Sequence, residues 1–293
     1  PPPPAAPSHG RLRLRFGRGG LALLLLLLVV AGVCLHYGID GPKPWGKEIM
    51  KRVADGKDLR AREYGIIGVW WGCVLSAGIG GLLLLFASWW MPGGKNAPRR
   101  LGTRPPAPGS LFHLTLFLIL GAAVFFRAPE MTHSFWNDEE YSMRRYVHGS
   151  EEIQADGRLV FEKVTWDDTL FHNFNGNNHQ LQSTLSRASL EAWRFLRGKP
   201  EEAFSEMVAR LPSLAAGVFT LVALALAGVE MRRPSVGLGA AALLALHPWH
   251  VRYAVEARGY SLMLFFMMAA ALALLHALRR DKVLAWLCFA LAQ

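Results

Sequence analysis

Two short polar stretches of this chain have residues that could do chemistry, and each lies beside a long apolar segment. The first, residues 136–141, reads Trp-Asn-Asp-Glu-Glu-Tyr and follows the apolar residues 111–126. The second, residues 256–260, reads Glu-Ala-Arg-Gly-Tyr and opens the apolar residues 260–278. Charged side chains are costly near a bilayer and are usually kept there for a task. An acidic and a cationic group on one membrane face predict a site that handles an anion linked to a lipid.

In the first stretch, Asp138 and Glu139 are candidate proton acceptors. A carboxylate just beyond the end of a membrane span is well placed to take a proton from a substrate hydroxyl at the boundary between water and lipid. The alternative is a solvated acidic turn, because Asn137 and Asp138 are good helix N-cap residues. Acidic triplets are common, so this motif alone predicts little.

In the second stretch, Arg258 is the candidate phosphate-binding residue. Its guanidinium leads into an uncharged helix and offers paired donors to a phosphate. Arg252, Glu256 and Tyr260 lie close to it in sequence and belong to the same candidate site. The alternative is an interfacial arginine and tyrosine that anchor a helix end.

A third polar stretch, residues 171–180, contains Asn178 and His179. Amide and imidazole groups in a glycine-containing loop suit sugar hydroxyls or a phosphate, although such asparagine-rich stretches are often only turns. Several histidines fall on the same predicted side of the membrane: His133, His148, His172, His179, His247 and His250. Their spacing matches no familiar zinc ligand set, so neither a metal nor another cofactor is predicted.

The elements that must position these residues are membrane-spanning helices. Hydrophobic residues make up 52% of the chain and charged residues 18%, which favours an integral membrane protein. A span needs about 20 apolar residues. Five runs meet or approach this length: residues 20–37, 65–91, 111–126, 212–229 and 260–278. Residues 236–249 form a weaker sixth, and 282–293 begin a seventh. The predicted fold class is therefore all-α, a polytopic membrane protein.

Charge sets the expected orientation. Four basic stretches, nearly free of acids, are predicted to be cytoplasmic by the positive-inside rule: residues 1–18, 95–104, 232–233 and 279–282. Alternating spans then place residues 128–206 outside, with 14 of the 22 acidic residues. Residues 40–63 disagree, because they should also be outside yet carry seven Lys or Arg against five acids. Either they form an exposed amphipathic helix, or one of the first two spans is wrongly assigned.

Three regions are expected along the chain. Residues 1–18 form a basic disordered arm, and residues 19–110 hold two extra N-terminal spans and a Pro-rich linker. Residues 111–293 form the core, and residues 180–198 of its external loop have the spacing of an amphipathic interfacial helix, with a small soluble subdomain as the alternative. We expect the chain to be truncated at its C-terminus, because it ends inside an apolar run.

Two composition features carry little functional information. Net charge is +10, but the positive-inside bias accounts for it better than a nucleic-acid partner does. The cysteines, Cys34, Cys73 and Cys288, lie in apolar segments and are expected to be buried hydrophobes rather than a disulfide framework.

The order of the motifs over residues 111–278 resembles a known family. A span is followed by an Asp-Glu pair, an Asn-Asn-His element precedes an interfacial helix, Arg210-Leu211-Pro212-Ser213 opens a span, and a span ending at Pro248 leads to Glu-Ala-Arg-Gly-Tyr. This order is similar to that of the GT-C membrane glycosyltransferases of the protein O-mannosyltransferase and aminoarabinose transferase type (glycosyltransferase family 39-like). The resemblance implies transfer of a sugar from a polyprenyl-phosphate carrier with inversion at the anomeric carbon.

The resemblance also implies roles for individual residues. Asp138 matches the family's general base, with Glu139 as its acidic neighbour. His179 matches the histidine of a His-Pro-Leu-like element, and Arg258 matches the arginine near the donor phosphate. The chain departs from the family's pattern where Gln180 replaces the usual proline and where His247 replaces a common serine.

The expected protein is therefore a glycosyltransferase in a bacterial inner (plasma) membrane, with its active site facing outside. Its partners are a polyprenyl-phosphate-linked sugar, the lipid bilayer and a protein, lipid or polysaccharide acceptor. Asp138 and Glu139 are the expected catalytic residues. The remaining expected site residues bind the donor phosphate (Arg258, Arg252, Tyr260) or other parts of the substrates (His179, Asn178, Glu256).

Two alternatives from other classes remain. One is a transporter or flippase of a lipid-linked anion, which would be expected to place charges or broken helices near mid-membrane. The other is a non-catalytic membrane scaffold, in which replacement of Asp138 would barely affect function.

Overall fold

The structure is a computed structural model that describes residues 18–86, 105, 107–173, 177–280 and 282–293. It is mostly helical, and four helices in the described residues are long and apolar enough to cross a membrane. They are α3 (Ala61–Leu85), α5 (Ser110–Arg127, with a span extending to Thr132), α9 (Glu206–Glu230) and α12 (Tyr260–Arg280). The predicted helical, multi-pass membrane architecture is confirmed at this level. Residues 1–17 of the expected arm (1–18) and most of the Pro-rich linker lie outside the described residues, and Arg18 begins α1.

The predicted spans coincide with these helices where the structure describes them. The exception is the first predicted span, residues 20–37, which falls in α1 (Arg18–Asp40). The described apolar stretch of α1, Leu24–Asp40, is shorter than a full span. The weak sixth run forms α10 (Pro234–Leu246), which is also short. Pro234 suits the first position of a helix, and Pro248 disfavours a helical backbone at the preceding residue, His247, where α10 ends. The last run forms α13 (Val283–Leu291).

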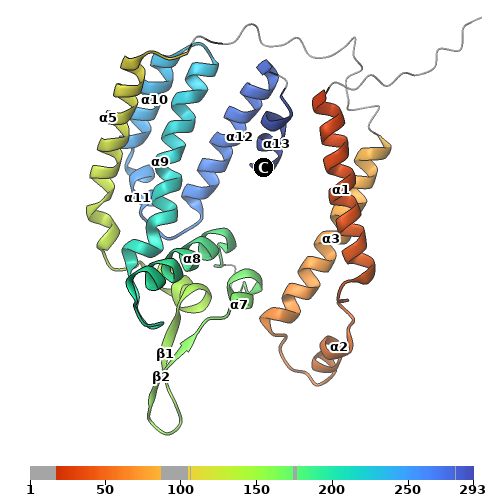
Figure 1. Ribbon diagram of the computed structural model, residues 1–293. Helices are drawn as coiled ribbons and strands as arrows, with labels where there is room; N and C mark the ends of the chain where they lie inside the picture. The colour runs from red at the N-terminus through yellow and green to blue at the C-terminus, as the bar shows by residue number, and fades with distance from the viewer. Residues whose placement is uncertain (1–17, 87–104, 106, 174–176, 281) are drawn as a thin grey trace, which may run out of the picture.

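Helix α9 is the centre of the helical core and packs against α5, α10 and α12 (Figure 1). The apolar core between α5, α9 and α10 contains Leu221, Ala225 and Ala241, all fully buried. Where α9 crosses α10, Gly228 and Gly237 face each other so closely that a Cβ on Gly237 would lie 2.8 Å from the Cα of Gly228. Small residues of this kind let membrane helices approach through their backbones.

Gly237→Ala is therefore expected to destabilise the protein, whereas Gly239→Ala on the same helix should not. A Cβ at position 237 would also lie 2.7 Å from the carbonyl oxygen of Ala225, while one at position 239 would meet nothing within 4 Å. Overpacking costs about 1–3 kcal/mol, and Gly→Ala without strain gains about 0.4–1 kcal/mol. Thermal unfolding of the full-length protein in nanodiscs should show opposite shifts. Equal shifts would mean that α9 and α10 do not cross at these glycines.

The segment between α5 and α9 carries the elements of the predicted external loop. They are η1 (Pro129–Thr132), α6 (Asn137–Ser142), η2 (Met143–Val147), α7 (Trp166–Phe171) and α8 (Gln180–Arg197). The predicted amphipathic helix is α8, which packs on α9 while Phe195 and Leu196 stay exposed. Gly198 ends it in the left-handed conformation that favours glycine, at φ 57°.

The loop also contains a hairpin that the sequence analysis did not predict. Strands β1 (Gly149–Ile153) and β2 (Leu159–Lys163) pair antiparallel, with Gly149 opposite Lys163. Asp156 and Gly157 form its tip, and Gly157 has φ 81°. An Asp-Gly pair is a strong hairpin signal, but most of the strand residues are exposed, so no apolar alternation marks the strands.

Within the basic residues 40–63, one short amphipathic helix forms at residues 47–54, and residue 61 begins the next long helix. Helix α2 (Lys47–Ala54) buries Ile49 and exposes Met50 and Val53. Arg52 of α2 pairs with the buried Glu63 at the start of α3, Nε to Oε2 3.2 Å. Helix α3 in turn contacts α7.

Candidate active site

The structure brings together the acidic and cationic residues that the sequence analysis placed on one membrane face. Asp138 lies in the first turn of α6, and Arg258 lies in the turn between α11 (Pro248–Ala254) and α12. Their side chains form an ion pair, with Nη1 of Arg258 3.2 Å from Oδ2 of Asp138. The Asp138 side chain is 51% exposed and that of Arg258 17%. The pair is therefore accessible from outside the protein while its cation is anchored within it.

Arg258 keeps binding capacity beyond this pair. Its guanidinium lies over the ring of Tyr260, 4.9 Å from the ring centroid, which orients the cation by a cation–π contact. Its Nε is buried and has no hydrogen-bond acceptor among the described residues. A tetrahedral oxyanion such as a phosphate can supply that acceptor, since arginine binds phosphate through paired donors.

His179 also contacts the ring of Tyr260. It occupies the N-cap position of α8, and the two ring centroids are 5.5 Å apart, edge to face. Gly259 packs against it so tightly that a Cβ there would lie 3.1 Å from Nδ1 of His179. Burial, and secondarily the charge of Arg258, lowers the pKa of His179. The imidazole is therefore biased towards its neutral form, in which one ring nitrogen accepts a hydrogen bond.

Glu139, next to Asp138, points the other way and is buried. Its carboxylate receives two hydrogen bonds from Arg210 of α9, from Nε at 3.1 Å and from Nη2 at 2.9 Å. It also accepts from the backbone N–H of Ala257 at 2.6 Å and of Trp136 at 3.2 Å. Glu139 thus joins α6, α9 and the turn that carries Arg258, which makes it a positioning residue in this geometry.

Arg210 was quoted in the sequence motif but given no role, and the structure makes it the hub of this side of the site. Its side chain is 4% exposed and stacks on Phe135, 4.7 Å from the ring centroid. Its Nη1 donates to the carbonyl oxygens of Glu130, Met131 and His133, the last at 2.6 Å. The signal available in the sequence was a charged residue at the start of an apolar helix, which is the rule that singled out Arg258.

Glu256 and Arg252 pair with each other rather than with Asp138. Nε of Arg252 lies 2.8 Å from Oε1 of Glu256, and its guanidinium lies between Trp136 and Trp249, 5.8 and 5.7 Å from their rings. A cavity of about 700 Å³ is lined by Trp136, Arg252, Glu256 and the Glu139–Arg210 pair, and neither Asp138 nor Arg258 is among its lining residues. Aromatic faces and carboxylates in one cavity suit a polyhydroxylated ligand.

Asn178 has a different environment from the other predicted site residues. Its Nδ2 donates to the carbonyl oxygens of Thr169 and His172, at 2.9 and 2.6 Å, and its Oδ1 accepts from Ser183 at 2.7 Å. All its side-chain groups are thus used within the protein. Asn178 fixes the turn that presents His179.

A second buried arginine, which the sequence analysis did not single out, supports the base of the site. Arg127 at the end of α5 is fully buried and donates to the carbonyl oxygen of Ala245 at 3.1 Å and to Nδ1 of His250 at 2.7 Å. Burial, with a smaller effect of Arg127, lowers the pKa of His250 to about 4. A neutral His250 can accept this hydrogen bond, and the contact ties α5 to α11.

Taken together, the site offers an exposed carboxylate, an anchored guanidinium with an unused donor, and a neutral imidazole around one tyrosine ring. The described residues contain no group of three or more His, Cys, Asp or Glu side chains that could hold a metal ion. The chain matches no protein-family model, no curated protein and no solved structure.

Proposed function

We propose that this protein is a membrane glycosyltransferase that moves a sugar from a polyprenyl-phosphate donor to an acceptor hydroxyl at the external face. The observation that carries the proposal is the accessible ion pair between Asp138 and Arg258, at the end of a membrane-spanning helix. Arg258 can bind the phosphate of the donor, and Asp138 can take the proton of the acceptor hydroxyl. Both are needed at one place for this reaction.

Arg258 binds the donor phosphate in the proposed mechanism. Its Nη1, which now contacts Asp138, and the neighbouring Nη2 form the paired donors that a phosphate accepts. Binding of the phosphate therefore draws Arg258 away from Asp138. The carboxylate loses its ion-pair partner when the donor arrives, and it becomes available as a base.

Asp138 then takes the proton of the acceptor hydroxyl. The acceptor oxygen attacks the anomeric carbon from the face opposite the phosphate, and the bond between that carbon and the phosphate oxygen breaks. The electron pair of this bond leaves with polyprenyl phosphate, whose negative charge Arg258 stabilises. Because a phosphate monoester is a good leaving group, no general acid is needed. The anomeric configuration inverts.

The cavity that Trp136, Glu256 and the Glu139–Arg210 pair line is proposed to hold the sugar or the acceptor. Trp136 offers an apolar face and Glu256 a carboxylate for hydroxyl groups. On the other side, His179 and Tyr260 confine the guanidinium of Arg258. The Glu139–Arg210 pair keeps α6 and the turn at residues 256–258 in register, so that Asp138 and Arg258 meet.

The test is release of polyprenyl phosphate by the full-length protein in nanodiscs. A panel of radiolabelled polyprenyl-phosphate hexoses and pentoses is offered with protein, lipid and polysaccharide acceptors. The double variant Asp138→Asn/Arg258→Gln serves as the inactive blank. The control is the double variant Glu140→Gln/Arg144→Gln. It removes the exposed ion pair between Oε1 of Glu140, which lies in α6 like Asp138, and Nη2 of Arg144, 2.6 Å away.

We expect release from at least one donor by the wild type and by the control, and none by the blank. Equal release by blank and control would remove the ion pair from the mechanism. Absence of release from every donor would contradict the transferase proposal. Movement of the intact donor between leaflets would then identify a transporter.

A further inference from the structure

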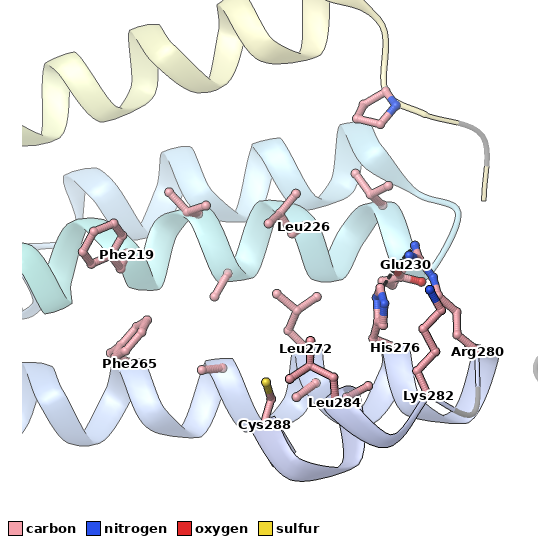
Figure 2. Close-up of a pocket in the computed structure, with 17 residues that line it drawn as sticks. Phe219, Leu226, Glu230, Phe265, Leu272, His276, Arg280, Lys282, Leu284 and Cys288 are labelled. Atoms are coloured by element: carbon pink, nitrogen blue, oxygen red, sulfur yellow. Dashed lines mark hydrogen bonds and ion pairs between the residues drawn. The ribbon is translucent and has the colours of Figure 1, made fainter. Parts of the chain in front are cut away.

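A second cavity lies away from the candidate active site, between α9, α12 and α13 (Figure 2). Its volume is about 860 Å³. Figure 2 shows Phe219 and Phe265 at one end, aliphatic side chains such as Leu226 and Leu272 along the middle, and charged side chains at the other end. Residues 219 to 230 of a helix span about 16 Å. The cavity is thus a long apolar slot with one polar end.

The charged end contains more cationic groups than carboxylates. Glu230 is the one acidic residue that lines the cavity in the described part of the chain. It contacts His276 at 3.0 Å, Arg279 at 3.5 Å and Arg280 at 3.2 Å. Lys282 also lines this end. Among the described residues, the cationic side chains at this end outnumber the one carboxylate, which favours a further anion here.

The guanidinium of Arg280 does not use all of its hydrogen-bond donors within the protein. Its Nη2 donates to Glu230, but its Nε is buried and has no hydrogen-bond acceptor among the described residues. The Arg280 side chain is 25% exposed at the cavity, so a phosphate there can accept from the accessible part of its guanidinium. The polar end is therefore built for an anion, and the apolar slot leading to it is built for a hydrocarbon chain.

We propose that this cavity binds an anionic glycerophospholipid, with one acyl chain along the slot and its phosphate at Arg280 and Lys282. The position supports this occupant. The charged end lies where α9 and α12 finish, whereas Arg210 and Tyr260 of the candidate active site lie where these helices begin. The basic residues 232–233 and 279–282 predict that this end is cytoplasmic. Anionic phospholipids are found in that leaflet, and basic pockets between helices bind their head groups.

This lipid site does not depend on the proposed transferase activity. The donor's phosphate is proposed to bind at Arg258, at the opposite end of α12, which is a helix of 21 residues and thus about 30 Å long. The two sites therefore predict separate ligands and separate variants. A failure of either proposal leaves the other open to its own test.

The test measures binding of phosphatidylglycerol and phosphatidylcholine, with identical acyl chains, to the full-length protein by native mass spectrometry. The double variant Arg280→Gln/Lys282→Gln removes the proposed phosphate ligands. Its control, Arg232→Gln/Arg233→Gln, removes two exposed charges from the turn after α9. We expect phosphatidylglycerol to bind at least tenfold more tightly than phosphatidylcholine, and the double variant, but not the control, to lose this preference.

A second pair of variants tests the apolar slot. Ala273 lines the cavity, whereas Met267 of the same helix does not line it and is exposed. Ala273→Trp should displace the acyl chain and reduce phosphatidylglycerol binding at least tenfold, and Met267→Trp should not. If Ala273→Trp fails to fold, Ala269→Phe fills the same slot with a smaller group.

Three outcomes would overturn the proposal. The first is equal binding of the two phospholipids, and the second is equal loss in the charge variant and its control. The third is competition by inorganic phosphate or by polyprenyl phosphate as effective as that by phosphatidylglycerol. Inorganic phosphate would then define a plain anion site, and polyprenyl phosphate would define a second site for the carrier.

Discussion

Arg210→Met is expected to destabilise the protein by about 3–5 kcal/mol, the range measured when one partner of a buried ion pair is removed. Arg210 and Glu139 have side chains that are 4% and 1% exposed, respectively. Without the guanidinium, the carboxylate of Glu139 stays buried with only backbone N–H donors, and four carbonyl oxygens lose a donor. Thermal unfolding of the full-length protein in nanodiscs measures the loss.

The matched control is Arg144→Met, which breaks the exposed pair with Glu140. Surface ion pairs contribute about 0–1 kcal/mol, so this variant should unfold close to the wild type. The double variant Glu139→Met/Arg210→Met removes both charges and should be less destabilised than Arg210→Met alone, because no charge is left unpaired. If Arg210→Met and Arg144→Met unfold alike, the Glu139–Arg210 pair is not buried as described.

The lengths of the apolar runs predicted the helical core, because the thickness of the bilayer sets how long a span must be. The helix ends were less predictable. The apolar run at residues 212–229 begins at Pro212, yet α9 begins at Glu206. Ser205 caps it through a hydrogen bond from the N–H of Val208, and the charged Glu206 and Arg210 keep its first residues out of the apolar run. The length of an apolar run therefore does not predict the residue at which such a helix begins.

Asp138 and Glu139 show where sequence reasoning about the site must stop. Consecutive residues of a helix point about 100° apart, so one of two neighbouring carboxylates turns outward and the other turns inward. The sequence gives no sign of which one is buried, since both are acidic and both follow the same span. Their partners decide it, and Arg258 and Arg210 come from parts of the chain far from α6.

Arg127 and Asn178 illustrate two further limits. Arg127 ends an apolar run, where an arginine can equally well reach the membrane surface, and only the packing of α5 against α10 and α11 buries it. Asn178 has the right chemistry for a substrate, but its hydrogen bonds to Thr169, His172 and Ser183 use all its side-chain groups. Residue type indicates what a side chain can bind, and tertiary contacts decide what it does bind.

Asp138→Asn is expected to lower kcat for sugar transfer by about 10²–10⁴-fold, the usual contribution of a general base. Asparagine keeps the shape of the side chain but cannot accept the acceptor's proton. Donor binding should become tighter, because Arg258 no longer has a carboxylate partner that competes with the phosphate. Glu140→Gln, on the same helix, should leave both kcat and KM unchanged.

Arg258→Gln is expected to act mainly on the donor. Loss of a hydrogen bond to a charged group costs about 1.5–3 kcal/mol, which corresponds to roughly tenfold to a hundredfold weaker donor binding. Part of the loss should also appear in kcat, because the leaving phosphate is stabilised by the same guanidinium. Donor affinity should thus rise in Asp138→Asn and fall in Arg258→Gln, which separates the base from the phosphate ligand. An ion pair with only a structural role would give both variants the same defect. Identical changes in kcat and KM for Asp138→Asn and Arg258→Gln would therefore contradict a base and a phosphate ligand that compete for one contact.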